Sequence, residues 1–288
     1  MAERYWRDFT AKHTYPSWSE AKSITQALVG ILVREGRIDI HAPADVPEWQ
    51  GADDPRKAIT PDMLLRMSSG LKFAEDYVDA GVSDVIEMLF GKGSEDVAAY
   101  AASLPLEHAP DTVWSYSSGT SNIVARCAAR ALGETGGKTG GKTGDGFRDF
   151  MFRELFGPIG MRSPLPKFDA AGTFIGSSFC YCTARDFARF GLLYLRGGTW
   201  DGQRILPDGW VDYARTPTPA VPDTEAMGYG AHWWLGMAGP GSFSCNGYEG
   251  QYTVLVPEKD LILVRHGKSP LEQKEVVLQW MADVAGCF

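Results

Sequence analysis

The chain has 288 residues, of which 44% are hydrophobic and 22% are charged, and its formal net charge is −8. This length is sufficient for one large domain, and the lack of a Lys or Arg cluster argues against a nucleic-acid partner. No apolar run approaches the roughly 18 residues that a membrane helix needs, and the opening MAERYWRDFT has no apolar signal core.

The cysteine content favours free thiols over a disulfide framework. The number of cysteines is odd and no C-x-x-C pair occurs. We expect these thiols to be partly buried, as free cysteines usually are. The compartment stays undetermined, with the cytoplasm favoured. The cysteines are Cys127, Cys180, Cys182, Cys245 and Cys287.

The first predicted element that carries chemistry is a helix in the segment YPSWSEAKSITQALVG, with Ser19 and Lys22 at its head. Residues three apart share a helix face, so Lys22 can reach the Ser19 hydroxyl. The helix dipole and partial desolvation favour a neutral lysine, which can take the serine proton. The backbone N–H of Ser19 can supply half of an oxyanion hole. The alternative is a serine N-cap followed by a chance lysine.

That helix and those that follow are predicted from apolar residues at helical spacing. The first helix has apolar residues at Ile24, Ala27, Leu28, Ile31 and Leu32, and Gly36 ends it. Further helices are predicted for residues 60–67, 82–90, 97–103, 120–132, 147–156 and 184–196. The segment TWDGQRI predicts a hairpin with a type I′ turn at Asp201-Gly202.

A glycine-rich segment, GETGGKTGGKTGDG, contains the phosphate-loop pattern G-x-x-x-x-G-K-T at residues 136–143. That pattern needs a strand before it, whereas a predicted helix precedes it here. The repeat of GGKT favours a flexible, solvated loop over residues 133–146.

Short β-branched or aromatic runs follow residue 229 and predict antiparallel strands. Val277, Trp280, Met281 and Val284 then repeat at helical spacing, and ERYWRDF near the start is a candidate further strand. We therefore expect an α/β (α+β) fold in a single domain. Its antiparallel sheet would be flanked by helices and built from both chain ends (residues 1–38 and 226–288), with a mostly helical subdomain (39–225) inserted.

Two more segments are candidates for the same site. Tyr116, in WSYSSGTSN, precedes a predicted helix, and its phenol can shuttle a proton if it lies beside the Ser–Lys pair. The strand FSCNG and the turn after it are rich in glycine, which allows close approach of a substrate to the backbone. The alternatives are a core or rim tyrosine and simple bulge glycines at Gly247 and Gly250.

Together these segments resemble the serine β-lactamase-like superfamily, in particular the class C-type relatives of penicillin-binding proteins, the carboxylesterases and the 6-aminohexanoate-dimer hydrolases. The S-x-x-K motif is similar to Ser19–Lys22 followed by Ser23, and Y-x-S is similar to Tyr116–Ser118. LLRMSSGL (64–71) resembles a further family segment, and 244–251 resembles the third motif. The resemblance covers nearly the whole chain from Tyr15 and implies a β-lactamase/transpeptidase-like fold.

The chain departs from the family pattern in two motifs. SCNG stands where K-T-G is usual, and the missing basic residue favours neutral esters or linear amides over penicillins. Glu20 stands in S-x-x-K where relatives carry an apolar residue. Its carboxylate would either hold Lys22 protonated or point to solvent.

Relatives normally carry a helix and one or two strands before S-x-x-K, whereas about 18 residues precede Ser19 here. We therefore expect an N-terminally shortened fold in which the last helix has little beside it. The uncovered apolar side chains of that helix would lower stability or promote self-association into a homo-oligomer.

The resemblance implies a metal-free and cofactor-free serine hydrolase with a small ester or amide substrate. Ser19 would be the nucleophile, Lys22 the base and Tyr116 the proton shuttle, with the oxyanion held by the backbone of Ser19 and of a residue near Asn246. Alternatives are a catalytically impaired homologue and a β-lactamase or D-alanyl peptidase. Candidate substrate-binding residues are Ser118, Tyr77, Trp233 and Gly247.

Overall fold

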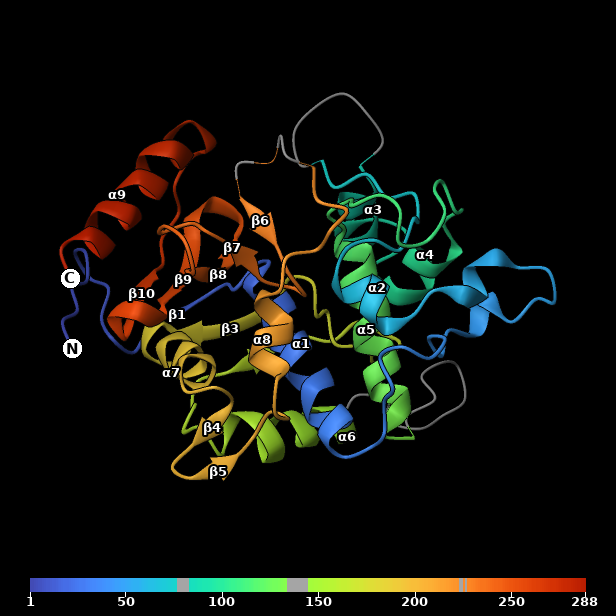
Figure 1. Ribbon diagram of the computed structural model, residues 1–288, viewed down its shortest axis with the longest axis horizontal. Helices are drawn as coiled ribbons and strands as arrows, with labels where there is room; N and C mark the ends of the chain where they lie inside the picture. The colour runs from blue at the N-terminus through green and yellow to red at the C-terminus, as the bar shows by residue number, and fades with distance from the viewer. Residues whose placement is uncertain (77–82, 134–144, 223–224, 226) are drawn as a thin grey trace.

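The computed structural model describes residues 1–76, 83–133, 145–222, 225 and 227–288 (Figure 1). A helical half, which holds α2 to α5, lies beside a half that contains the main sheet. The α-helices are α1 (Glu20–Arg34), α2 (Pro61–Leu65), α3 (Asp84–Phe90), α4 (Val97–Ser103), α5 (Ser118–Ala131), α6 (Asp145–Phe150), α7 (Ala184–Leu195), α8 (Trp210–Arg215) and α9 (Lys274–Gly286).

The strands are short and their pairing is antiparallel throughout. The main sheet has the order β10-β9-β8-β7-β6, a smaller one has the order β1-β3-β2, and β4 and β5 form a hairpin. The strands are β1 (Thr14–Tyr15), β2 (Leu165–Pro166), β3 (Cys180–Thr183), β4 (Thr199–Trp200), β5 (Gln203–Arg204), β6 (Gly228–Tyr229), β7 (Trp234–Leu235), β8 (Phe243–Gly247), β9 (Gln251–Val256) and β10 (Leu261–Arg265).

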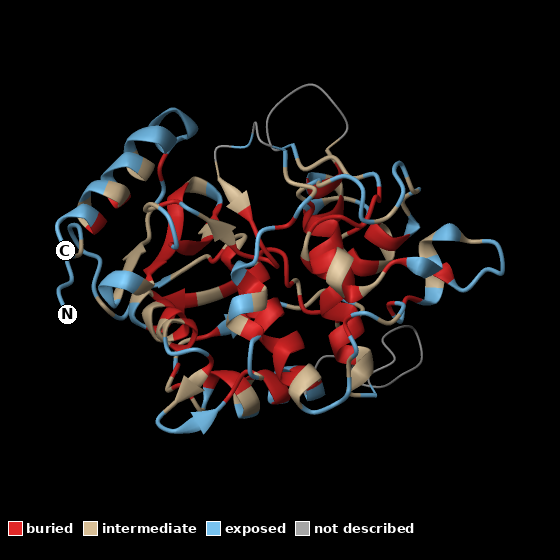
Figure 2. Cartoon of the chain, viewed as in Figure 1, coloured by how far each residue is buried: buried red, intermediate tan, exposed pale blue. Residues whose placement is uncertain are grey.

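Helix α1 runs through the centre of the molecule and is buried on every side over its first thirteen residues (Figure 2). It packs against α5 on the helical side and against β8 and β9 on the sheet side. A helix that is surrounded by protein must carry apolar or hydrogen-bonded residues all round, and this one does. The head of α1 is therefore held between the two halves.

The expected helices and the hairpin are present within the described ranges. Val97–Ser103 matches its prediction, and the stretch predicted over 147–156 is α6 followed by a π-helical segment, Met151–Phe156. Positive φ angles at Asp201 (46°) and Gly202 (79°) agree with the predicted type I′ turn. The phosphate-loop pattern at 136–143 and most of the predicted flexible loop lie outside the described residues.

The fold class is confirmed, but the main sheet is not built from both chain ends. All its strands come from residues 228–265, whereas the N-terminal part contributes only β1, which pairs with β3 in the smaller sheet. The segment ERYWRDF is not a strand. Its four charged residues interrupt any continuous apolar face, so no sheet edge gains buried surface by pairing with it.

Helix α9 lies along the outer side of the main sheet, and only part of its apolar face is buried (Figures 1 and 2). Met281 and Ala285 are buried in a small cluster with β9 side chains, and Val277 packs at its edge. Trp280, on the helix that was expected to have little beside it, is 52% exposed. The cysteines are free, four of them buried and Cys287 exposed, as predicted.

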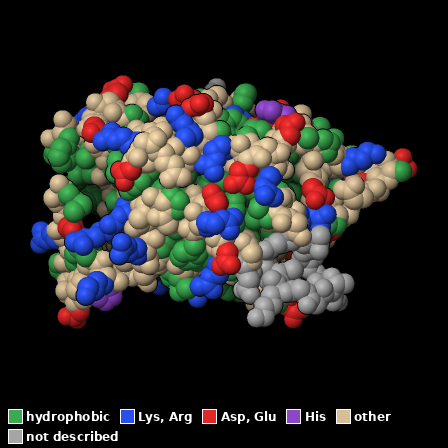
Figure 3. Space-filling model, turned by 90° about the horizontal axis from the view of Figure 1, so that it is seen from below, with side chains coloured by type: hydrophobic (Ala, Val, Ile, Leu, Met, Phe, Trp, Pro, Cys, Tyr) green, Lys and Arg blue, Asp and Glu red, His purple; other side chains and the backbone are tan. Residues whose placement is uncertain are grey.

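The outer surface carries charges of both signs. On the face shown in Figure 3, basic and acidic side chains are interspersed over most of the visible described surface. Among the described residues, no helix has the length and apolar character needed to cross a membrane.

Candidate active site

The Ser–Lys pair predicted from the sequence is in contact. Lys22 Nζ donates to Ser19 Oγ at 3.1 Å, to Ser118 Oγ at 3.0 Å and to the carbonyl oxygen of Ser177 at 3.0 Å. The lysine is 2% exposed. Three acceptors, at the N-cap of α1, in α5 and in the loop before β3, therefore fix the amine beside the serine hydroxyl.

The backbone just before Ser19 is bent sharply. Trp18 has a φ of 43°, a left-handed conformation that a bulky side chain rarely adopts. A Cβ atom added at Gly247 would lie 2.3 Å from the Ser17 carbonyl oxygen, so only glycine fits where β8 passes this segment. Gly247 therefore has a structural reason to be glycine, in addition to lining the pocket.

Burial shifts the pKa of the lysine toward neutrality. Desolvation lowers the pKa of Lys22 from 10.5 to about 8, and the negative charge of Glu75 opposes part of this shift. About one molecule in ten then holds the neutral amine at pH 7, and about half do so at pH 8. Lys22 can accordingly act as a general base near neutral pH.

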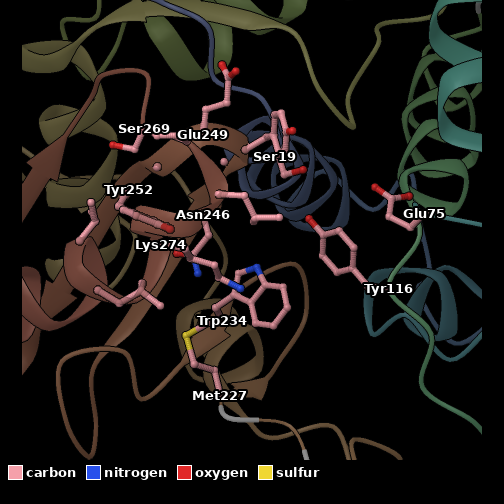
Figure 4. A pocket seen from close by; sticks show the side chains of 17 residues that line it. Ser19, Glu75, Tyr116, Met227, Trp234, Asn246, Glu249, Tyr252, Ser269 and Lys274 are labelled. Carbon is pink, nitrogen blue, oxygen red and sulfur yellow. The ribbon is translucent and has the colours of Figure 1, made fainter. Parts of the chain in front are cut away.

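Tyr116 contacts the same serine. It shares a hydrogen bond with Ser19, and in Figure 4 its hydroxyl points toward that residue. The Lys22 amine lies 4.8 Å from the centre of the tyrosine ring. Burial, and then the charge of Glu75, raise the pKa of Tyr116 far above its ordinary value. The phenol is therefore protonated at every working pH and is suited to relaying a proton rather than to being the base.

Ser118, predicted to bind substrate, instead connects Lys22 to a carboxylate. It is fully buried at the start of α5, accepts from Lys22 and donates to Glu75 Oε1 at 2.6 Å. Its backbone N–H donates to Glu75 Oε2 at 2.7 Å. Sequence reasoning missed Glu75, although it belongs to SGLKFAED, the segment that continues the family motif LLRMSSGL.

Neither interpretation of Glu20 holds in the structure. Its side chain is buried and turns away from Lys22 toward the sheet and the residue after β10. Thr253 Oγ1 donates to Glu20 Oε1 at 2.8 Å, and His266 Nε2 lies 3.3 Å from Glu20 Oε2. A carboxylate can replace an apolar residue here because Thr253 and His266 provide polar neighbours inside the core.

His232, also missed by sequence reasoning, braces the back of the site. Its imidazole contacts the Lys22 carbonyl oxygen at 3.0 Å and the Ser121 hydroxyl at 3.1 Å. Its own carbonyl accepts from Ser23 Oγ at 2.7 Å. Burial and the Lys22 charge lower the pKa of His232 to about 3, so the ring is neutral and structural.

A pocket of about 300 Å³ opens in front of Ser19 (Figure 4). Glu75 and Tyr116 lie on one side, and β8, the turn after it and α9 form the other. Asn246 lines this second side, and its Oδ1 is buried without a hydrogen-bond partner among the described residues. The lining residues are Ser19, Glu75, Tyr116, Met227, Trp234, Asn246, Gly247, Tyr248, Glu249, Gly250, Tyr252, Ser269, Pro270, Leu271, Lys274, Val277 and Leu278.

The prediction that Trp233 lies at the rim of the pocket is wrong by one position. Trp233 is fully buried against Tyr194 and Phe243, whereas Trp234 lines the pocket beside Tyr116. Adjacent strand residues face opposite sides of a sheet, so only one of this pair can face the pocket. Tyr77 lies outside the described residues.

Known proteins share this fold. Residues 2–285 match the family model described as Beta-lactamase. The 6-aminohexanoate-dimer hydrolase of Paenarthrobacter ureafaciens is 27% identical over 286 residues, which cover 94% of this chain and 70% of that protein. A candidate 6-aminohexanoate-dimer hydrolase from Bacillus anthracis superimposes with a TM-score of 0.82 at 20% identity, covering 99% of this chain and 75% of that chain. The octameric penicillin-binding protein homologue from Pyrococcus abyssi has a TM-score of 0.70 at 17% identity, with 96% and 67% covered.

Proposed function

Because the chain belongs to the Beta-lactamase family, we propose that it is a serine hydrolase that cleaves carboxylic esters or linear amides through an acyl-enzyme. The observation that carries the proposal is the buried lysine in contact with Ser19, with a pKa lowered to about 8. The 6-aminohexanoate-dimer hydrolase similar to this chain supports an amide or ester substrate.

In the proposed reaction, Ser19 Oγ attacks the carbonyl carbon while its proton passes to neutral Lys22. The backbone N–H of Ser19 and one near Asn246 stabilise the oxyanion of the tetrahedral intermediate. Tyr116 relays the proton to the leaving alkoxide or amine, whose departure leaves the acyl group on Ser19. Water, deprotonated by Lys22, then attacks the acyl-enzyme, and Lys22 returns this proton to Ser19 Oγ as the serine leaves.

The lack of a basic side chain on β8 favours this substrate class over β-lactams. The strand reads Phe-Ser-Cys-Asn-Gly and carries no basic side chain. A fused-ring β-lactam holds its carboxylate close to the reacting carbonyl, where a cation on this strand would meet it. We expect short 4-nitrophenyl esters to be cleaved at least about 100-fold faster than nitrocefin, a difference of roughly 2.7 kcal/mol in transition-state stabilisation.

A fluorophosphonate probe tests the nucleophile, because only an activated serine is labelled. The wild-type chain should be labelled and should hydrolyse 4-nitrophenyl butyrate, and Ser19→Ala should abolish both reactions. Ser17→Ala, which removes a nearby hydroxyl bonded to the Ser178 carbonyl, should still be labelled. If the folded wild-type chain is not labelled, the proposal fails and the impaired-homologue alternative replaces it.

A further inference from the structure

A buried acid–base pair lies behind the nucleophile and takes no part in the proposed reaction. Glu20, the residue after Ser19, and His266, directly after β10, have side chains that are 0% and 1% exposed. Glu20 Oε2 lies 3.3 Å from His266 Nε2, and Glu20 Oε1 accepts from Thr253 Oγ1 at 2.8 Å. Burying such groups is unfavourable even when they contact one another, so packing alone does not explain why they are here.

Glu20 connects the nucleophile helix to the strand that lines the pocket. Thr253, its hydrogen-bond donor on β9, lies directly opposite Cys245 of β8, and the next residue of β8 is Asn246. Figure 4 shows Asn246 on this strand and Ser19 on the head of α1, both at the pocket. The carboxylate therefore fixes the first turn of α1 against the strand pair that carries the second proposed oxyanion donor.

His266 extends this connection to the turn after β8, because both of its neighbours in sequence bind that turn. Arg265 Nη1 donates to the Gly250 carbonyl oxygen at 2.7 Å. The backbone N–H of Gly267 donates to Gln251 Oε1 at 2.9 Å. The imidazole itself packs against aromatic rings from β1 and α7. A displacement of His266 would therefore be passed on to the pocket wall.

We propose that Glu20 and His266 are positioning residues, which hold Ser19 and β8 at the spacing that two backbone N–H donors need to bind one oxyanion. The inference rests on the proposed function, because it concerns the same tetrahedral intermediate. Hydrogen bonds are directional, whereas apolar contacts allow a helix to slide along a sheet. A polar link at this point keeps the donors preorganised, and a misplacement of about 1 Å can lower a rate by about 100-fold.

Two variants of Glu20 separate the polar link from side-chain volume. Glu20→Gln keeps an acceptor for Thr253 and a polar group beside His266, so kcat/KM for 4-nitrophenyl butyrate should stay within about threefold of the wild-type value. Glu20→Met keeps the length but loses the link, so kcat/KM should fall by about 10- to 100-fold, less than the loss of a whole oxyanion donor causes. Wild-type kcat/KM in Glu20→Met would overturn the inference.

A transition-state analogue reports the oxyanion geometry directly. A propyl trifluoromethyl ketone forms a tetrahedral adduct with Ser19, and the oxygen of this adduct occupies the oxyanion site. Its inhibition constant should rise in Glu20→Met by the same factor by which kcat/KM falls, because both depend on binding of the oxyanion. An inhibition constant that stays at the wild-type value while kcat/KM falls would also overturn the inference.

A double variant separates loss of positioning from loss of stability. Glu20→Met/His266→Phe removes both polar groups and fills their space with apolar atoms, a replacement that often preserves the stability of a buried pair. It should melt at or above the temperature of Glu20→Met and still bind the ketone weakly. Wild-type binding of the ketone by the double variant would show that Glu20→Met is merely destabilised, and the inference would be wrong.

Asp186→Asn is the matched control for the loss of a buried carboxylate. Asp186 is 2% exposed and binds Ser163 and Arg189, away from the contact between α1 and the main sheet. This variant should lower the melting temperature and leave the inhibition constant of the ketone unchanged. A rise equal to that in Glu20→Met would show that any buried carboxylate has this effect, which would refute the specific role of Glu20.

The positioning role and the proposed function fail in different ways. If the wild-type chain is neither labelled by the fluorophosphonate nor inhibited by the ketone, the proposed function fails, and the positioning role fails with it. If the wild-type chain reacts through Ser19 and Glu20→Met reacts equally well, the positioning role alone is refuted.

Discussion

The two sides of the pocket differ in how their polar groups are bonded. On the side of α1 and α5, Lys22 donates three hydrogen bonds, and Ser118 passes the network on to Glu75. On the side of β8 and α9, Asn246 Oδ1 has no partner and Lys274 has no ion pair within the described residues. One side holds its groups in place before substrate arrives, and the other leaves groups for the substrate to bind.

This difference separates reaction chemistry from specificity. A buried network in which each polar group is bonded costs no reorganisation during the reaction and depends little on the substrate. Groups without protein partners discriminate between ligands, because only a complementary ligand satisfies them. Substitutions on the side of α1 and α5 should therefore change kcat for every substrate. Substitutions on the side of β8 and α9 should change KM for some substrates.

The largest effect should come from the lysine. Lys22→Ala should lower kcat/KM for all esters by about 10³-fold, because the serine loses its base within a unit that acts together. Lys22→Arg keeps a positive charge and hydrogen-bond donors but cannot deprotonate near neutral pH, so it should be equally impaired. An active Lys22→Arg enzyme with unchanged thermal stability would show that the charge matters and that the lysine is not the base.

Tyr116→Phe should discriminate between leaving groups. Nitrophenolate leaves without protonation, so hydrolysis of 4-nitrophenyl butyrate should fall by only a few fold. An alkyl ester or amide needs a proton on its leaving group, and its hydrolysis should fall by about 100-fold. Steady-state kinetics of the same variant on both substrates provides its own control, and equal losses on both would argue against the proton relay.

The pH profile should report Lys22 directly. Activity requires the neutral amine, so kcat/KM should rise with pH and level off above a pKa of about 8. The negative charge of Glu75 raises this pKa, so Glu75→Gln should move the rising limb to lower pH. Asp76→Asn, in the adjacent position, is the control. A limb that moves to higher pH in Glu75→Gln would contradict the proposed electrostatics.

Local sequence spacing predicted which residues carry the chemistry of the site, but it did not predict which distant residues surround them. Ser19 and Lys22 are three positions apart at the start of α1, so their contact follows from helix geometry alone. The burial of Glu20 depends on Thr253 and His266, more than 200 residues away, and no local pattern encodes that pairing. Glu75 was missed for the same reason.

Register errors explain the remaining differences. Trp233 and Trp234 are adjacent aromatic residues in a short strand region, and a shift of one residue exchanges the core face for the pocket face. The hairpin at Asp201-Gly202 was predictable because its turn requires residues that tolerate positive φ. A turn specifies its own geometry, whereas packing against neighbouring elements decides which side chain of a two-residue strand faces the core.

The smallest effect on stability should come from Trp280, an exposed residue of α9 that is adjacent to a buried one. Met281 is 1% exposed and packs in the cluster beneath the helix, whereas Trp280 is 52% exposed. Met281→Ala should lower the free energy of unfolding by about 2–5 kcal/mol, because it leaves a cavity. Trp280→Ser should change it by no more than about 0.5 kcal/mol, as surface substitutions usually do.

Urea denaturation followed by circular dichroism measures both values, and light scattering adds the state of association. If copies of the chain associate through the exposed apolar residues of α9, Trp280→Ser should lower the scattering mass at high protein concentration. The apparent stability of this variant at high concentration should then fall to that of the diluted wild-type protein, because association stabilises the folded state. A large loss of monomer stability in Trp280→Ser, with no change in mass, would show that α9 packs on the sheet through its tryptophan.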